Sequence, residues 1–136
     1  MQVRRDEVAQ LRSSEDIVHV RQKVRAWAIE IGFGLVDQTK IVTAASELAR
    51  NTVTYGGGGT LQLRWLVQDA GRQGLRLDFT DEGPGIADLK RALTDGFTTG
   101  SGLGLGLSGS RRLMNDFEID SAPGKGTRVS VARWKP

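Results

Sequence analysis

The sequence predicts an α+β fold, a two-layer α/β sandwich in which helices cover one face of a mainly antiparallel, mixed sheet. Two observations carry this prediction. Apolar residues recur at three- and four-residue steps between residues 13 and 55, and they alternate with polar residues further along the chain. The alternating segments also follow one another through short turns, and strands joined in this way pair antiparallel. The helices must then cover one face of the sheet.

The N-terminal part predicts one strand and two helices. Residues 1–12 are expected to form an edge strand. Ser13 or Ser14 can cap a helix that ends near Gly32, and its apolar stripe comprises Ile17, Val20, Val24, Trp27 and Ile31. A second helix is expected from near Asp37 to the glycines at 56–59, with an apolar face of Ile41, Ala45, Leu48, Thr52 and Tyr55.

The remaining chain predicts two hairpins separated by a glycine-rich region. Residues 60–69 and 74–81 are expected to pair through the turn at 69–74. In the first of these strands one face carries Leu61, Leu63, Trp65 and Val67, and the other carries Gln62, Arg64, Leu66 and Gln68. After the glycine-rich region, "LSGSRRLMNDF" predicts a short helix, and residues 117–134 predict a second strand–turn–strand pair.

Composition excludes several classes of protein. The 136 residues are enough for one domain, and 38% are hydrophobic and 26% charged. The chain has no cysteine, so disulfides and thiolate metal sites are excluded. No apolar run is long enough for a membrane span or signal core, and the cytoplasm is the expected location. The net charge of +3 comes from scattered basic residues, so no nucleic-acid partner is expected.

The common glycine motifs do not fit. A P-loop requires Ser or Thr after its Gly-Lys pair, but the pair at 124–125 is followed by Gly126. The pattern G-x-G-x-x-G occurs at 104–109, yet it follows no predicted strand, and no acidic residue for a ribose lies beyond Asp120. The glycine loop of protein kinases requires Val where this chain has Arg111.

Four other motifs occur in a fixed order. Glu47 and Asn51 are one helical turn apart, so their side chains project from the same side of the predicted helix. Asp81 ends a predicted strand and opens the sequence D-x-G-x-G. Alternating glycine and leucine at 102–107 lead into a helix, and "GKGT" at 124–127 opens the last strand.

Together these motifs resemble those of the GHKL superfamily of ATP-binding proteins, which share the Bergerat fold. The resemblance runs from about residue 13 to 134. The segments "TAASELARNTVTYGGGG" and "GLGLGLSGSRRLMNDFEI" most resemble those of the anti-sigma serine/threonine kinases of the RsbT switch type. It implies one ATP-binding kinase domain over residues 1–136, with ATP between the helical layer and a glycine-rich lid.

The resemblance assigns adenine to the motif at Asp81. An ionised carboxylate only accepts hydrogen bonds, so Asp81 suits the exocyclic amino group of adenine and repels the carbonyl oxygen of guanine. Gly83 and Gly85 let the turn pass beneath the ring without side-chain clash. The family pattern gives Thr127 a share in this adenine-and-water network.

The alternating segment is assigned to phosphate. Glycines without side chains leave backbone N–H groups free to surround phosphate oxygens, and the following helix adds its positive N-terminal end. The leucines between them anchor the loop to the core. The expected ATP-binding residues of this segment are Gly102, Leu103, Gly104, Leu105, Gly106 and Leu107.

The two polar residues of the second helix are assigned to Mg²⁺ binding and to catalysis. Asn51 offers a neutral oxygen to Mg²⁺, which takes its other ligands from phosphates and water. In the resembled family the glutamate at the position of Glu47 is the general base that accepts the proton of the attacking nucleophile. Arg50 lies beside them and is a candidate contact to phosphate or to a partner, although a solvated arginine fits equally well.

The resemblance implies a serine/threonine-protein kinase that phosphorylates a STAS-domain antagonist or scaffold protein and is then released to activate a downstream phosphatase. The alternative is an anti-sigma factor that sequesters a sigma subunit and phosphorylates its antagonist. A nucleotide sensor without chemistry is a third reading, and Glu47 argues against it because binding alone needs no base. His19 falls inside the first helix and is expected to be a helix-surface or partly buried residue, not a phosphoacceptor.

Overall fold

The computed structural model describes residues 1–88, 93 and 107–136. Over these residues the chain forms five strands and three helices. In chain order they are β1 (Gln2–Leu11), α1 (Ser14–Ile31), α2 (Leu35–Thr54), β2 (Gly59–Val67), β3 (Gln73–Asp81), α4 (Leu107–Leu113), β4 (Asp116–Ser121) and β5 (Thr127–Trp134).

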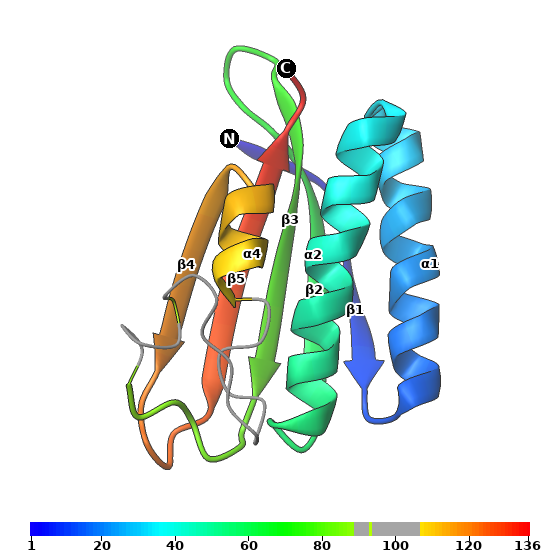
Figure 1. The fold of residues 1–136 in the computed structure, drawn as a ribbon. Coiled ribbons are helices and arrows are strands. Elements are labelled where there is room, and N and C mark those ends of the chain that lie inside the picture. The colour runs from blue at the N-terminus through cyan, green and yellow to red at the C-terminus, as the bar shows by residue number, and fades with distance from the viewer. Residues whose placement is uncertain (89–92, 94–106) are drawn as a thin grey trace.

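The strands form one sheet in the order β1-β2-β3-β5-β4, and each of the pairings between these described strands is antiparallel. All three helices lie on one face of this sheet (Figure 1). The prediction of a two-layer α+β fold with helices on one face is confirmed, and β1 is an edge strand as expected.

The first helix begins and ends as its sequence predicts. Ser13 is the N-cap, and its side chain accepts a hydrogen bond from the backbone N–H of Asp16 at 3.3 Å. Gly32 ends the helix with φ of 105°, a left-handed conformation that glycine adopts without strain. Helix α2 begins at Leu35, two residues before the expected Asp37, after an N-cap at Gly34 that offers no side-chain hydrogen bond.

The core lies between the helices and the sheet. Inward residues of β2 and β3 are completely buried against α1 and α2; they are Leu61, Leu63, Leu75 and Leu77. On the opposite face, Leu66 was expected among polar residues, but it is 5% exposed and packs with Ala132 and Trp134 in a separate small cluster. The outer face of the sheet therefore has a small buried apolar cluster of its own.

The last helix is shorter than predicted. Helix α4 ends at Leu113, whereas the sequence pattern extends it to Phe117, which belongs to β4. Asn115 explains the difference because it bonds to the sheet: its N–H donates to the carbonyl of Ala132, and its side-chain oxygen accepts from the N–H of Trp134. These non-local bonds draw the chain out of the helix and into β4.

Strand register brings the predicted site residues to one end of the sheet. Asp81 at the end of β3 lies opposite Gly59 of β2 on one side and opposite Thr127 of β5 on the other. Thr127 in turn lies opposite Ser121 at the end of β4. The C-terminal end of α2 is joined to β2 by residues 55–58, so it also lies at this end.

Candidate functional site

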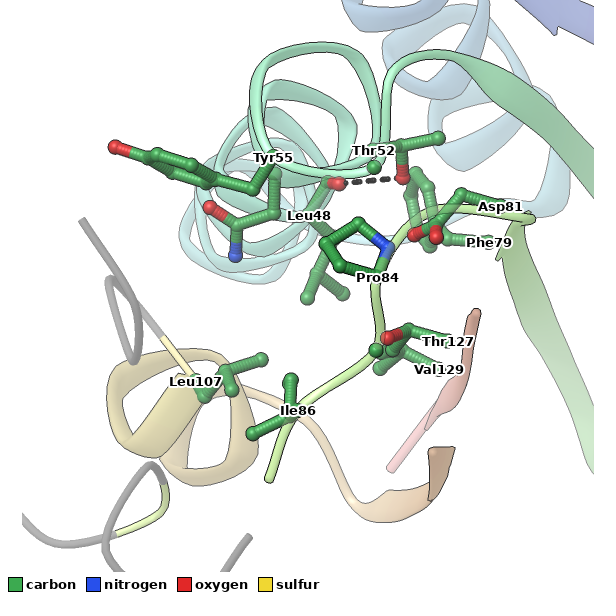
Figure 2. Close-up of a pocket in the computed structure, with 13 residues that line it drawn as sticks. Leu48, Thr52, Tyr55, Phe79, Asp81, Pro84, Ile86, Leu107, Thr127 and Val129 are labelled. Atoms are coloured by element: carbon green, nitrogen blue, oxygen red, sulfur yellow. Dashed lines mark hydrogen bonds between the residues drawn. The ribbon is translucent and has the colours of Figure 1, made fainter. Parts of the chain in front are cut away.

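A pocket opens between the C-terminal half of α2, the ends of β3 and β5, and the turn after β3 (Figure 2). Most of its wall is apolar, and the polar side chains that line it include those of Asn51, Asp81 and Thr127. The lining residues are Leu48, Asn51, Thr52, Tyr55, Gly56, Phe79, Asp81, Pro84, Gly85, Ile86, Leu107, Thr127 and Val129. A mainly apolar cleft with a few polar groups is typical of a site for a small organic ligand.

Asp81 is held in place by its own turn. Its Oδ1 accepts a hydrogen bond from the backbone N–H of Gly83 at 2.9 Å. Burial raises the pKa of the Asp81 carboxyl, and the backbone N–H groups of Gly83 and Thr127 partly oppose this effect. The pocket therefore contains a fixed, partly desolvated hydrogen-bond acceptor.

Gly56 gives the Asp81 carboxylate the space it occupies. A Cβ atom on Gly56 would lie 2.4 Å from the Cγ of Asp81 and 2.5 Å from its Oδ2. A Cβ on Gly83 would lie 2.7 Å from the backbone of Gly56. The end of α2 and the turn after β3 thus approach each other at distances that only glycines permit. Sequence reasoning assigned Gly83 to the pocket but treated Gly56 only as the end of a helix.

Ser121 ties the turn after β3 to the turn between β4 and β5. Its Oγ accepts the backbone N–H of Ile86 at 2.9 Å and lies 2.8 Å from the carbonyl oxygen of Gly126. The same Oγ lies 2.8 Å from the Oγ1 of Thr127. The sequence analysis did not select Ser121. The one feature that could have indicated it is a hydroxyl side chain five positions before Gly126 and Thr127, on the strand that precedes β5.

Glu47 and Arg50 lie outside this pocket. They form an ion pair at 3.2 Å, with side chains 31% and 53% exposed respectively. Both line a separate groove on the outer side of α1 and α2, which also contains Arg21 and Arg25. The structure therefore brings Asn51, Asp81, Gly85 and Thr127 together in the pocket and places Glu47 in the separate groove.

The other predicted residues divide between described and undescribed parts of the chain. Leu107 lines the pocket at the first turn of α4. Gly102, Leu103, Gly104, Leu105 and Gly106 lie outside the described residues. His19 lies on α1, the first helix, as expected, and it is exposed. Within the part of the chain that the structure describes, no helix is long and apolar enough to span a membrane.

The fold and the pocket define a class of ATP-binding protein, and comparison with known families agrees. Residues 36–136 match the family described as histidine kinase-, DNA gyrase B-, and HSP90-like ATPase. The chain belongs to this family.

Two relatives place the chain within it. It is 47% identical over 119 residues to the serine/threonine-protein kinase RsbT of Bacillus subtilis (strain 168), an alignment that covers 88% of this chain and 89% of that protein. It is 27% identical to the anti-sigma F factor of Thermoanaerobacter sp. (strain X514), with 91% and 89% covered. The predictions of a GHKL domain and of a serine/threonine-protein kinase related to the anti-sigma factors are confirmed.

Solved structures support the fold. The crystal structure of the RsbU and RsbW domains of Rv1364c from Mycobacterium tuberculosis has a TM-score of 0.65 at 21% identity, over 97% of this chain and 33% of that chain. The mycobacterial sensor histidine kinase MprB has a TM-score of 0.56 at 22% identity, over 96% and 97%. At these identities the likeness concerns the fold alone.

Proposed function

We propose that this chain transfers the γ-phosphoryl group of ATP to a serine or threonine of a STAS-domain protein in a sigma-factor partner-switching pathway. The observation that carries the proposal is the convergence of Asn51, Asp81 and Thr127 in one pocket of a chain that is 47% identical to a serine/threonine kinase. A cytoplasmic location and a downstream phosphatase belong to the same proposal.

Asp81 is proposed to select adenine. As a carboxylate it accepts hydrogen bonds and donates none, so it suits the exocyclic amino group. A 6-oxo purine would set two acceptors against each other and leave the partly buried carboxylate unsatisfied, which costs about 1–3 kcal/mol. The apolar wall formed by Leu48, Phe79, Ile86 and Val129 provides the surface for the flat ring.

Asn51 is proposed as the protein ligand of Mg²⁺. No cluster of three or more His, Asp or Glu side chains suited to a metal occurs among the described residues, so they provide no complete protein cage. Mg²⁺ fits such a site because it usually retains waters and binds to one or two protein oxygens and to substrate phosphates. When bound, it would offset the charge that develops on the phosphates. The amide oxygen of Asn51, at the pocket wall, has the hard, neutral chemistry required.

Glu47 is proposed as the general base. Its carboxylate stands one turn before Asn51 and faces a groove open on the outer surface of α1 and α2. A serine or threonine of another protein can therefore approach it without entering the nucleotide pocket. Glu47 would accept the hydroxyl proton as the oxygen bonds to phosphorus and the bond to ADP breaks. Arg50, which pairs with Glu47 at 3.2 Å and is 53% exposed, is proposed to contact phosphate or the partner.

The experiment is phosphoryl transfer from γ-labelled ATP with Mg²⁺ to candidate STAS-domain proteins. Wild type is expected to label its partner, and Glu47→Ala to lose transfer by at least 100-fold while ATP affinity stays within about threefold. Glu30→Ala is the matched control because Glu30 is an exposed helical glutamate that is also paired with an arginine, Arg5, far from the pocket. Normal transfer by Glu47→Ala would show that the base is assigned wrongly.

The second candidate function is sequestration of a sigma subunit, and it rests on the 27% identity to an anti-sigma F factor. Both functions use the same pocket, so nucleotide binding does not separate them. Capture experiments with a purified STAS-domain protein and a purified sigma factor do. Retention of the STAS-domain protein alone supports the switch kinase, and retention of the sigma factor supports the alternative.

A further inference from the structure

We propose that Ser121 is a positioning residue that fixes the hydroxyl proton of Thr127 and thereby helps to reserve the pocket for purines with an amino group at position 6. This inference rests on the proposed ATP site. It concerns a residue that does not line the pocket and acts only through its neighbour.

The hydrogen bonds around Ser121 leave one consistent proton arrangement. A serine hydroxyl has a single proton and two acceptor lone pairs. The Gly126 carbonyl at 2.8 Å can only accept, and the Ile86 N–H at 2.9 Å can only donate. Ser121 therefore gives its proton to Gly126 and accepts from Ile86, and its remaining lone pair faces the Oγ1 of Thr127 at 2.8 Å.

Thr127 must then donate its own proton to Ser121. The reverse direction would take the Ser121 proton from the Gly126 carbonyl, and Gly126 is buried in its turn. Leaving a buried carbonyl without a donor is unfavourable. Because Thr127 lines the pocket, it presents only acceptor lone pairs to a ligand.

The consequence is a pair of acceptors at one end of the sheet. Asp81 and Thr127 are opposite each other in the β3–β5 register, and both line the pocket. An exocyclic amino group has two protons and can satisfy both, directly or through a bound water. An unconstrained threonine hydroxyl could rotate and donate to a 6-oxo group, so it would tolerate hypoxanthine or guanine. Ser121 removes that freedom.

The test compares ATP with inosine triphosphate, whose base differs from adenine by a 6-oxo group in place of the 6-amino group. Calorimetry on the full chain with Mg²⁺ gives the ratio of the two dissociation constants. In Ser121→Ala the freed Thr127 proton can face the pocket, and we expect the preference for ATP to fall at least fivefold. Ser121→Thr retains a hydroxyl and is expected to keep the wild-type preference for ATP.

Ser130→Ala is the control for loss of a buried hydroxyl. Ser130 is 5% exposed on β5, bonds to Asp78 and does not line the pocket. The ratio of the two dissociation constants in Ser130→Ala is expected to match that of wild type, even if the thermal midpoint of the variant falls. If Ser121→Ala does not fold, Thr127→Val removes the same acceptors and must lower the preference at least fivefold.

Two results overturn the inference. A folded Ser121→Ala whose preference for ATP stays within twofold of wild type shows that Ser121 does not set selectivity. An unchanged ratio in Thr127→Val shows that the acceptor lone pairs of Thr127 do not set selectivity. Either result leaves an ATP-binding wild type intact, so the proposed function survives. A wild type that binds neither nucleotide defeats both proposals together.

Discussion

The carboxylate of Asp81 lies in the pocket, where it is proposed to bind adenine. Its partial burial also makes the folded state less stable than it would be with a fully hydrated carboxylate. Burial raises its pKa, so the folded state holds this proton to a higher pH than the unfolded state does. Between the ordinary aspartate pKa and the raised one, the folded chain binds more protons, and the contribution of Asp81 to stability falls as pH rises. Above the raised pKa the carboxylate is ionised in both states, and the full penalty is present.

Asp81→Asn should therefore separate binding from stability. An amide retains an oxygen to accept the N–H of Gly83, but it also offers N–H donors to the adenine amino group. We expect ATP to bind about 10- to 100-fold more weakly, and the thermal midpoint to be equal to or above that of wild type. Calorimetry and thermal denaturation measure the two effects. Asp120→Asn, at an exposed position of β4, is the control that should change neither.

Acid should weaken ATP binding through the same carboxyl. Protonated Asp81 carries an O–H that faces the amino group, so ATP affinity is expected to fall as pH decreases through the raised pKa. Because phosphates titrate too, the informative quantity is the ratio of wild-type to Asp81→Asn affinity at each pH. The ratio should shrink toward one in acid. A ratio that stays constant with pH would mean that Asp81 does not titrate in contact with the ligand.

At the scale of elements, the site depends on how closely α2 and β3 approach. Gly56→Ala puts a Cβ 2.4 Å from the Cγ of Asp81, so the carboxylate or the helix end must move. We expect at least a tenfold loss of ATP affinity, because the adenine contact needs the present Asp81 position. Calorimetry measures the loss.

Gly109→Ala is the matched control for that substitution. A Cβ at Gly109 meets nothing within 4 Å, and alanine favours the helical conformation of α4 by about 0.5–1 kcal/mol. Its ATP affinity should remain that of wild type and its stability should rise slightly. Equal affinity in both variants would show that the contact between Gly56 and Asp81 does not position the ligand.

The elements that the sequence predicted well are those fixed by local chemistry. Ser13 caps α1 and Gly32 ends it, and both act through backbone groups within four residues. The end of α4 was wrong because Asn115 bonds to residues of β5 that are distant in sequence. The Leu66 cluster was missed for the same reason, since its partners lie on another strand.

The candidate site was predicted in its residue types more fully than in its geometry. Four residues advance a helix by about 40° beyond a full turn, and Glu47 and Asn51 accordingly line different openings on α2. Motif spacing does not contain that distinction, which depends on how α2 packs on the sheet. Ser121 and Gly56 contribute contacts made only after strands pair and the helix docks, so no local pattern selected them.

At the scale of the whole molecule, the pocket lies between the helical layer and the sheet and is lined by residues of both. Its walls come from α2 in the helical layer, from β3 and β5 in the sheet, and from Leu107 at the start of α4 (Figure 2). These contacts come from residues 48 to 129 and exist together only in the folded chain. A ligand that binds there recognises the native state and not the unfolded one, so its binding free energy adds to the free energy of unfolding.

ATP should therefore raise the thermal midpoint of the whole chain. At 100 times its dissociation constant it adds about 2.7 kcal/mol, or roughly 6–12 °C for a domain of this size. Differential scanning calorimetry with Mg²⁺ measures the shift. Glu47→Ala should keep it, since Glu47 lies outside the pocket, and Asp81→Asn should lose about half of it or more at the same ATP concentration. GTP at that concentration should give little shift. Equal stabilisation by ATP and GTP would contradict a pocket that reads the amino group of adenine through Asp81.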